Sequence, residues 1–234
     1  MSQGAKVARQ AAAAGSESRP EAESAAQIAQ QVAELNLRAL HVARERSLAL
    51  APAAAGRRAP HAIDSLHSAW RMVGDEALVR LAQSPYLLVD AHLAEAARWG
   101  EAAAIAEGRS LATDPLGDGS AAAAFADPQH AGFVATLFLY VWHLARAEPL
   151  AAELALGASA DTLTVFRGLS LRTIEQLART RAGWVALRWE DRPAVWAAML
   201  GAASRGDREA LRIERLKGLQ RIAGACAAAA AAGR

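Results

Sequence analysis

Arginine residues gather near the end of the chain at spacings that could bind phosphate. Three of them, Arg208, Arg212 and Arg215, are four and three residues apart, which places them on one face of a helix. Guanidinium groups bind phosphate oxygens, and such contacts make binding to nucleic acid sensitive to salt. Acidic residues in the same segment also fit a solvated helix with internal ion pairs. The candidate DNA-binding residues are Arg205, Arg208, Arg212, Arg215, Lys217 and Arg221.

Tryptophans form the second candidate group, which could bind a protein partner. Trp184 and Trp189 bound the best strand candidate of the chain, and Trp196 lies in the helix expected after it. Exposed tryptophans often anchor a partner protein, whereas buried ones pack a core. The sequence leaves both possibilities open for each of the three.

Catalytic and metal-binding patterns are missing. The six histidines have no metal-ligand spacing, and Cys226 is the single cysteine, so it has no internal disulfide partner. Nucleophile and phosphate-loop motifs do not occur. The adjacent carboxylates at Asp75-Glu76 and Glu190-Asp191 fall at expected helix starts, where free N–H groups favour them. We therefore predict a protein that is not an enzyme, with no catalytic residue, metal or cofactor.

Composition favours a globular protein of the cytoplasm. The chain has 234 residues, of which 53% are hydrophobic, and a formal net charge of +2, which alone does not indicate nucleic acid. The longest strongly apolar stretch, Ala131 to Trp142, is too short to span a bilayer. Residues 1–20 lack the apolar run of a signal peptide. We expect a cytoplasmic location and no membrane partner.

Hydrophobic periodicity and turn residues predict a mainly helical, all-α fold with one or two short strands. Ser18 and Glu21 form a capping box that predicts the start of the first helix. Asn36 lies in the apolar stripe of that helix, either at its edge or as a buried polar residue that fixes register. The predicted segments are a disordered stretch (1–20), one helical half (21–109), a surface linker (110–130), a second helical half (131–224) and an alanine-rich tail (225–234).

The two halves carry a weak repeat. Residues 81–89 can be laid over residues 177–185, because each stretch has a helix ending in Leu-Ala, a turn and an apolar run. Matches of this kind also arise by chance in sequences rich in alanine and leucine. The halves are thus either two similar units or unrelated helical segments.

The stretch from Leu154 to Trp196 resembles the FlhD family of flagellar transcriptional regulators. That family has an L-G stretch, an L-T-L helix start, a K-L-A helix end and an F-R-F-D strand in this order. The matching residues here are Leu156-Gly157, Leu169-Ser170-Leu171, Leu177-Ala178 and Leu187-Arg188-Trp189-Glu190.

A second match lies near the start of the chain. Residues 34–40 (ELNLRAL), with Ala43-Arg44, resemble the opening helix of the family, which reads D-I-N-L with an A-Q-R further on. In the family this helix lies shortly before the L-G stretch, whereas here more than a hundred residues intervene. The chain therefore contains either two partial copies of the family unit or one unit with a large insertion.

The resemblance implies a helical, dimerising transcriptional co-regulator that acts with a zinc-binding partner subunit to activate flagellar promoters. The cysteine that links dimers in the family has no counterpart here, where Val185 and Ala186 stand. We expect a co-activator of motility genes that forms a homo-oligomer, binds a second regulatory subunit and contacts DNA through the complex. The alternative is a helical adaptor or chaperone-like dimer that does not bind DNA.

Overall fold

Helices make up most of the computed structural model, which describes residues 3–49, 62–110 and 124–232. The predicted all-α class is confirmed, with one short two-stranded sheet among these residues. The first half contains α1 (Gln3–Ala49), α2 (Ala62–Ser65), α3 (His67–Met72), α4 (Asp75–Ala82), β1 (Val89–Asp90) and α5 (Ala96–Ala106). The second contains η2 (Ala124–Ala126), η3 (Pro128–His130), α6 (Ala131–Ala147), α7 (Pro149–Leu156), α8 (Ala160–Gly168), α9 (Leu171–Thr180), η4 (Ala182–Trp184), β2 (Ala186–Leu187), α10 (Pro193–Arg205) and α11 (Arg208–Ala232).

Local signals set several of the helix boundaries. Ser159 and Ser170 cap α8 and α9, because each side-chain oxygen accepts a hydrogen bond from an N–H in the first turn. Gly157 and Gly206 end α7 and α10 in the left-handed conformation, which glycine adopts without steric cost. The sequence predicts the helix end at Gly157 and the helix starts at Ser159 and Ser170, and the structure agrees at these three positions.

Three predicted boundaries are wrong. Helix α1 begins at Gln3 and not at Ser18, so the helix continues through the segment expected to be disordered. Helix α11 passes Gly224 and ends at Ala232, in keeping with the high helix propensity of its alanine-rich end. The sequence predicts a helix over about Ala91 to Gly108, but α5 begins only at Ala96, after His92, which has a φ of 56°.

The predicted linker at 110–130 is only partly a surface loop. Residues 111–123 lie outside the described part, but Ala124 and Phe125 are buried in a 3₁₀ turn. The ring of Phe125 packs on Phe133 of α6, with centroids 5.3 Å apart. The end of this segment therefore belongs to the core.

The two halves repeat one unit around their strands. Only two described residues other than glycine have a positive φ, His92 (56°) and Trp189 (57°), and each lies just after a strand. The indoles of Trp99 and Trp196 each donate to a carbonyl eight residues earlier, at 3.1 Å and 2.8 Å. Because these accepting carbonyls, of Ala91 and Arg188, directly precede His92 and Trp189, the two stretches are equivalent position by position.

This equivalence corrects the predicted alignment by one residue. Leu81 and Leu177 correspond as expected, but Val89 corresponds to Ala186 and not to Val185. The second half therefore has one more residue between helix and strand. In the antiparallel ladder, Val89 pairs with Leu187 and Asp90 with Ala186. Each residue of β1 thus pairs with the counterpart of its neighbour in β1. A two-fold axis between the two strands produces this reciprocal pairing.

The two copies exchange their last helices. Helix α10 of the second copy packs on α2, α3 and α4 of the first, whereas α5 of the first copy packs on α8 and α9 of the second. Trp99 stacks on Phe166 with centroids 4.8 Å apart, and Trp196 stacks on Trp70 at 5.6 Å. The predicted halves are consequently not separate domains, since they share one hydrophobic core.

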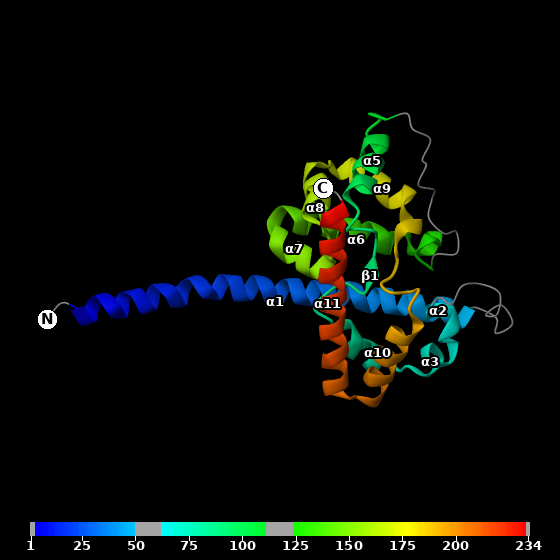
Figure 1. The fold of residues 1–234 in the computed structure, drawn as a ribbon, viewed down its shortest axis with the longest axis horizontal. Helices are drawn as coiled ribbons and strands as arrows, with labels where there is room; N and C mark the ends of the chain where they lie inside the picture. The colour runs from blue at the N-terminus through cyan, green and yellow to red at the C-terminus, as the bar shows by residue number, and fades with distance from the viewer. Residues whose placement is uncertain (1–2, 50–61, 111–123, 233–234) are drawn as a thin grey trace.

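Helix α1 passes between two groups of helices (Figure 1). Helices α5 to α9 lie on one side of it, and α2, α3 and α10 on the other. Within α1, Asn36 is fully buried, and its amide nitrogen donates to the carbonyls of Ala82 (3.1 Å) and Tyr86 (2.9 Å). Its side-chain oxygen accepts from the Leu88 N–H at 2.7 Å. Asn36 therefore fixes the path from α4 to β1.

Helix α11 follows the exchanged helices and packs on α10. The sequence predicts that the last helix starts at Asp207, and in the structure Asp207 accepts a hydrogen bond from the Ala210 N–H at 2.9 Å. No helix within the described residues has the length and apolar character needed to cross a membrane.

Candidate functional site

Two of the predicted DNA-binding residues face the body of the protein. The Arg215 guanidinium donates to the backbone carbonyl of Arg80 on α4, and burial lowers its pKa. The Arg221 guanidinium lies over the ring of Trp189, 5.5 Å from the ring centroid. The predicted single face of Arg208, Arg212 and Arg215 is therefore divided, because the third of them points inward.

The other cationic residues of the segment are exposed. Arg205 and Arg208 have no ion pair among the described residues. Arg212 lies 3.4 Å from Glu209, and Lys217 lies 2.7 Å from Glu214. The sequence left open a phosphate-binding face or a solvated helix with internal ion pairs. The structure has features of both, because exposed arginines without an ion pair lie beside ion-paired cationic residues.

Two of the three candidate tryptophans are core residues. Trp184 is 1% exposed and Trp196 is 0% exposed, so neither can contact a partner in this structure. Trp184 packs on Trp99 with centroids 5.1 Å apart, and the Arg98 guanidinium lies 4.6 Å from its ring. Trp189 is half-buried between Tyr86 and Arg221 under α11. Partner binding through Trp189 would require α11 to move.

Helix α11 comes closest to the sheet region at Gly218. A β-carbon at this position would overlap the Tyr86 hydroxyl and approach the Trp189 ring to 2.9 Å. The Tyr86 hydroxyl has no hydrogen-bond partner among the described residues. Burial raises the pKa of Tyr86 to about 12, although Arg188, Arg215 and Arg221 act in the opposite direction. Glycine at position 218 is what permits this crossing.

Arg188, the arginine of the matched strand motif, joins the two copies. Its side chain is buried, and its Nε donates to the Leu87 carbonyl at 3.0 Å. One terminal nitrogen donates to the Leu156 carbonyl at 2.7 Å, and the other lies 3.9 Å from the Asp90 carboxylate. The side chain thus has a structural role at the junction and is not open to a ligand.

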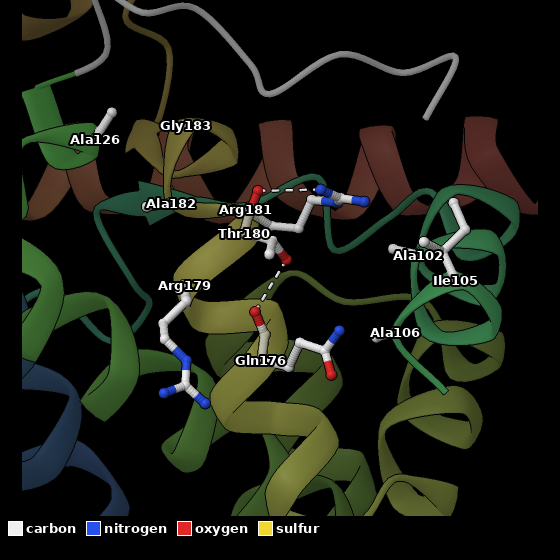
Figure 2. Close-up of a pocket in the computed structure, with 10 residues that line it drawn as sticks. All are labelled: Ala102, Ile105, Ala106, Ala126, Gln176, Arg179, Thr180, Arg181, Ala182 and Gly183. Atoms are coloured by element: carbon white, nitrogen blue, oxygen red, sulfur yellow. Dashed lines mark hydrogen bonds between the residues drawn. The ribbon is translucent and has the colours of Figure 1, made fainter. Parts of the chain in front are cut away.

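A groove between α5 and α9 is the site that the sequence did not reveal. Its volume is about 490 Å³. Ala102, Ile105 and Ala106 of α5 form an apolar wall, and residues of α9 and η4 form the base. Figure 2 shows the side chains of Gln176 and Arg181 extending toward α5, while Arg179 stands on the side away from it. The lining side chains that the structure describes include no carboxylate.

The groove has an equivalent in the other copy, and α11 covers it. By the correspondences above, Ala106 and Gln176 of the groove match Ala203 of α10 and Arg80 of α4. Arg80 Nε donates to the Ala203 carbonyl at 3.1 Å, and Arg215 of α11 contacts the Arg80 carbonyl. One of the two equivalent α–α surfaces is therefore covered by a helix, and no helix among the described residues covers the other.

The described residues do not form a metal site. No group of three or more His, Cys, Asp or Glu side chains among them could hold a metal ion. Cys226 is a free, half-buried thiol whose pKa is raised by burial. Comparison of the chain with known protein families, with curated proteins and with solved structures gives no match.

Proposed function

We propose that this protein is a transcriptional co-regulator of motility genes that acts through a protein partner and DNA, as its resemblance to the FlhD family implies. One observation carries the proposal. The family links its dimers by a cysteine at the position of Val185 and Ala186, and in this chain the strand starting there pairs with its counterpart in the other copy. The resemblance thus assigns a dimer contact to the place where the two copies meet.

The duplication also accounts for the distance between the two matched stretches. The early match, around Asn36, lies in α1, which opens the first copy. The later match runs from the end of α7 to β2 in the second copy. We propose that the two stretches belong to two copies, and not to one unit with a large insertion, which would account for the more than a hundred residues between them.

The pairing expected of a homo-oligomer is then provided within one chain. The exchanged helices α5 and α10 take the place of an intermolecular interface, because each packs in the opposite copy. We therefore propose that the chain acts as a fused dimer. A second regulatory subunit would bind this unit directly.

Contact with DNA is proposed for the outer face of α11 and for the last residue of α10. Arg205, Arg208 and Arg212 are exposed there, where guanidinium groups can reach phosphate oxygens. Arg215 and Arg221 are withdrawn from this proposal, because their side chains contact Arg80 and Trp189. Few phosphate contacts predict weak binding by the chain alone and stronger binding with a partner subunit.

Chromatin immunoprecipitation of the tagged protein in its native cells tests the proposal. We expect enrichment at motility promoters that the double variant Arg208→Glu/Arg212→Glu loses. The matched control, Arg71→Glu/Arg172→Glu, changes the same charge at exposed arginines outside α11 and should keep the enrichment. Normal levels of folded protein with no promoter enrichment would contradict the proposed function.

A protein-binding adaptor without a DNA role is the second candidate. The observation that favours it is the pairing of Arg212 and Lys217 with Glu209 and Glu214, which reduces the positive potential of α11. Fluorescence anisotropy with labelled duplex DNA at low salt separates the candidates. Binding that weakens steeply with salt supports the co-regulator, and no binding with or without the partner subunit supports the adaptor.

A further inference from the structure

We propose that the α5–α9 groove is a docking site for an amphipathic helix of a partner protein, with small or aliphatic residues toward α5 and acidic residues toward Arg179. This proposal rests on the proposed function only in that both require a protein partner. An adaptor that does not bind DNA would also use this docking site. Its test uses no DNA, so either proposal can fail alone.

The structure contains a template for this mode of binding. On the equivalent surface of the other copy, α11 packs against α10 and reaches α4. In this part of α11, Leu211 is buried while Arg212 and Leu216 remain exposed, whereas Gly218 and Ile222, further along the helix, face Tyr86 and Gly157. This surface therefore accepts one face of a helix, the arrangement used by many proteins that bind a partner helix in a groove.

The open groove keeps the shape-determining features of the covered one. Trp99 of α5 and Trp196 of α10 make the same indole hydrogen bond to the chain segment before the helix. The two helices therefore start in the same way in the two copies. The wall residues of α5 are small apart from Ile105, which leaves room for a second helix to approach closely.

Charge distinguishes the two surfaces and defines the occupant. Position 176 carries a neutral glutamine where the covered surface has Arg80, and α9 adds Arg179 at the edge of the groove. Arg179 is exposed and has no ion pair among the described residues. Because the described lining includes arginine but no carboxylate, a helix with acidic residues on its inner side matches it better than the arginine-bearing face of α11.

Two synthetic peptides of residues 208–223 provide the probe. In the first, Arg215 and Arg221, whose side chains face inward in α11, are replaced by Glu. In the second, the outward-facing Arg208 and Arg212 are replaced by Glu, which gives the same net charge on the opposite face. Each peptide is titrated into the isotopically labelled full-length chain, and binding is followed by NMR chemical shifts.

We expect the first peptide to bind about tenfold more tightly than the second, with shift changes confined to α5, α9 and η4. Arg179→Glu in the protein should abolish this preference, and Ile105→Ala should weaken binding of the first peptide. The matched control Arg172→Glu, an exposed arginine at the other end of α9, should leave both affinities unchanged.

Three outcomes would overturn the proposal. The first is no shift change in the groove with either peptide. The second is equal affinity for both peptides, or a preference that survives Arg179→Glu while the protein remains folded by circular dichroism. The third is a dimer of the free chain that sedimentation detects and Arg179→Glu dissociates, which would identify a second copy as the occupant.

Discussion

Trp99 and Trp196 occupy the same position in the two copies of the repeated unit, and each is buried against an aromatic residue of the other copy. Trp99 stacks on Phe166, and Trp196 stacks on Trp70. Both indoles donate to the carbonyl that precedes a residue with positive φ. This reciprocal contact makes the two copies depend on each other for a complete core.

Replacing Asn36 by leucine should destabilise the protein strongly. The substitution leaves the Leu88 N–H and the carbonyls of Ala82 and Tyr86 without their buried partner. We expect a loss of about 2–5 kcal/mol in the free energy of unfolding, measured by urea denaturation. The control Gln30→Ala, at an exposed position of α1, should change it by less than about 0.5 kcal/mol. Equal stability of N36L and the wild type would contradict this role.

Two glycines of α11 provide a matched test of how it docks. Gly218→Ala places a β-carbon against Tyr86 and Trp189 and should cost about 1–3 kcal/mol or release the helix. Gly224→Ala meets no atom within 4 Å and should leave stability unchanged or raise it by up to about 1 kcal/mol. Thermal unfolding checks both, together with tryptophan fluorescence, to which Trp189 contributes as one of six tryptophans. A neutral G218A would show that α11 does not cross there.

Stability should fall at alkaline pH because of buried tyrosines. Burial raises the pKa of Tyr86 from 10.0 to about 12, and it raises that of Tyr140 equally far. Ionisation is easier in the unfolded chain, so the free energy of unfolding is constant below about pH 10 and decreases as the pH rises through 12. Urea denaturation at pH 8 and at pH 11 measures the difference.

The Tyr86→Phe variant should show a smaller alkaline loss than the wild type. At pH 8 it should cost little, because the Tyr86 hydroxyl has no hydrogen-bond partner among the described residues. Tyr140→Phe is the comparison, since that hydroxyl donates to the Ile28 carbonyl at 3.5 Å. An alkaline loss that is identical in wild type and Y86F would rule out Tyr86 as its source.

The free chain should behave as a monomer. Both copies lie in one chain, so sedimentation equilibrium should give a mass near 24.5 kDa. The urea midpoint should not vary with protein concentration, in contrast to an obligate dimer of separate chains. A concentration-dependent midpoint would show that a further intermolecular interface contributes to the fold.

Much of the secondary structure follows from local sequence. Ser159, Ser170 and Asp207 cap helices where the pattern predicts, because capping involves only neighbouring residues. The strand expected over residues 184–189 is shorter, with only Ala186–Leu187 paired, because η4 precedes it and Trp189 turns away with positive φ. Its partner β1 could be expected only as an extended piece, since pairing depends on the other copy.

The candidate site was less accessible to sequence analysis. Charge and spacing identified the cationic residues of α11. They could not show that Arg215 and Arg221 point inward, because this depends on how α11 packs against Arg80 and Trp189 in the folded chain. The groove joins α5 of one copy to α9 of the other, and no local pattern reports such an exchange. The equal spacing from Ala91 to Trp99 and from Arg188 to Trp196 was the available signal.

The single α11 has a consequence for stoichiometry. A symmetric dimer of separate chains would offer two identical grooves and bind two partner helices. Here α11 packs over one of the two equivalent surfaces, so a complex through the remaining groove contains one partner for each chain. Such a complex has a direction: the partner lies at the α5–α9 end, and the cationic face of α11 is fixed relative to it.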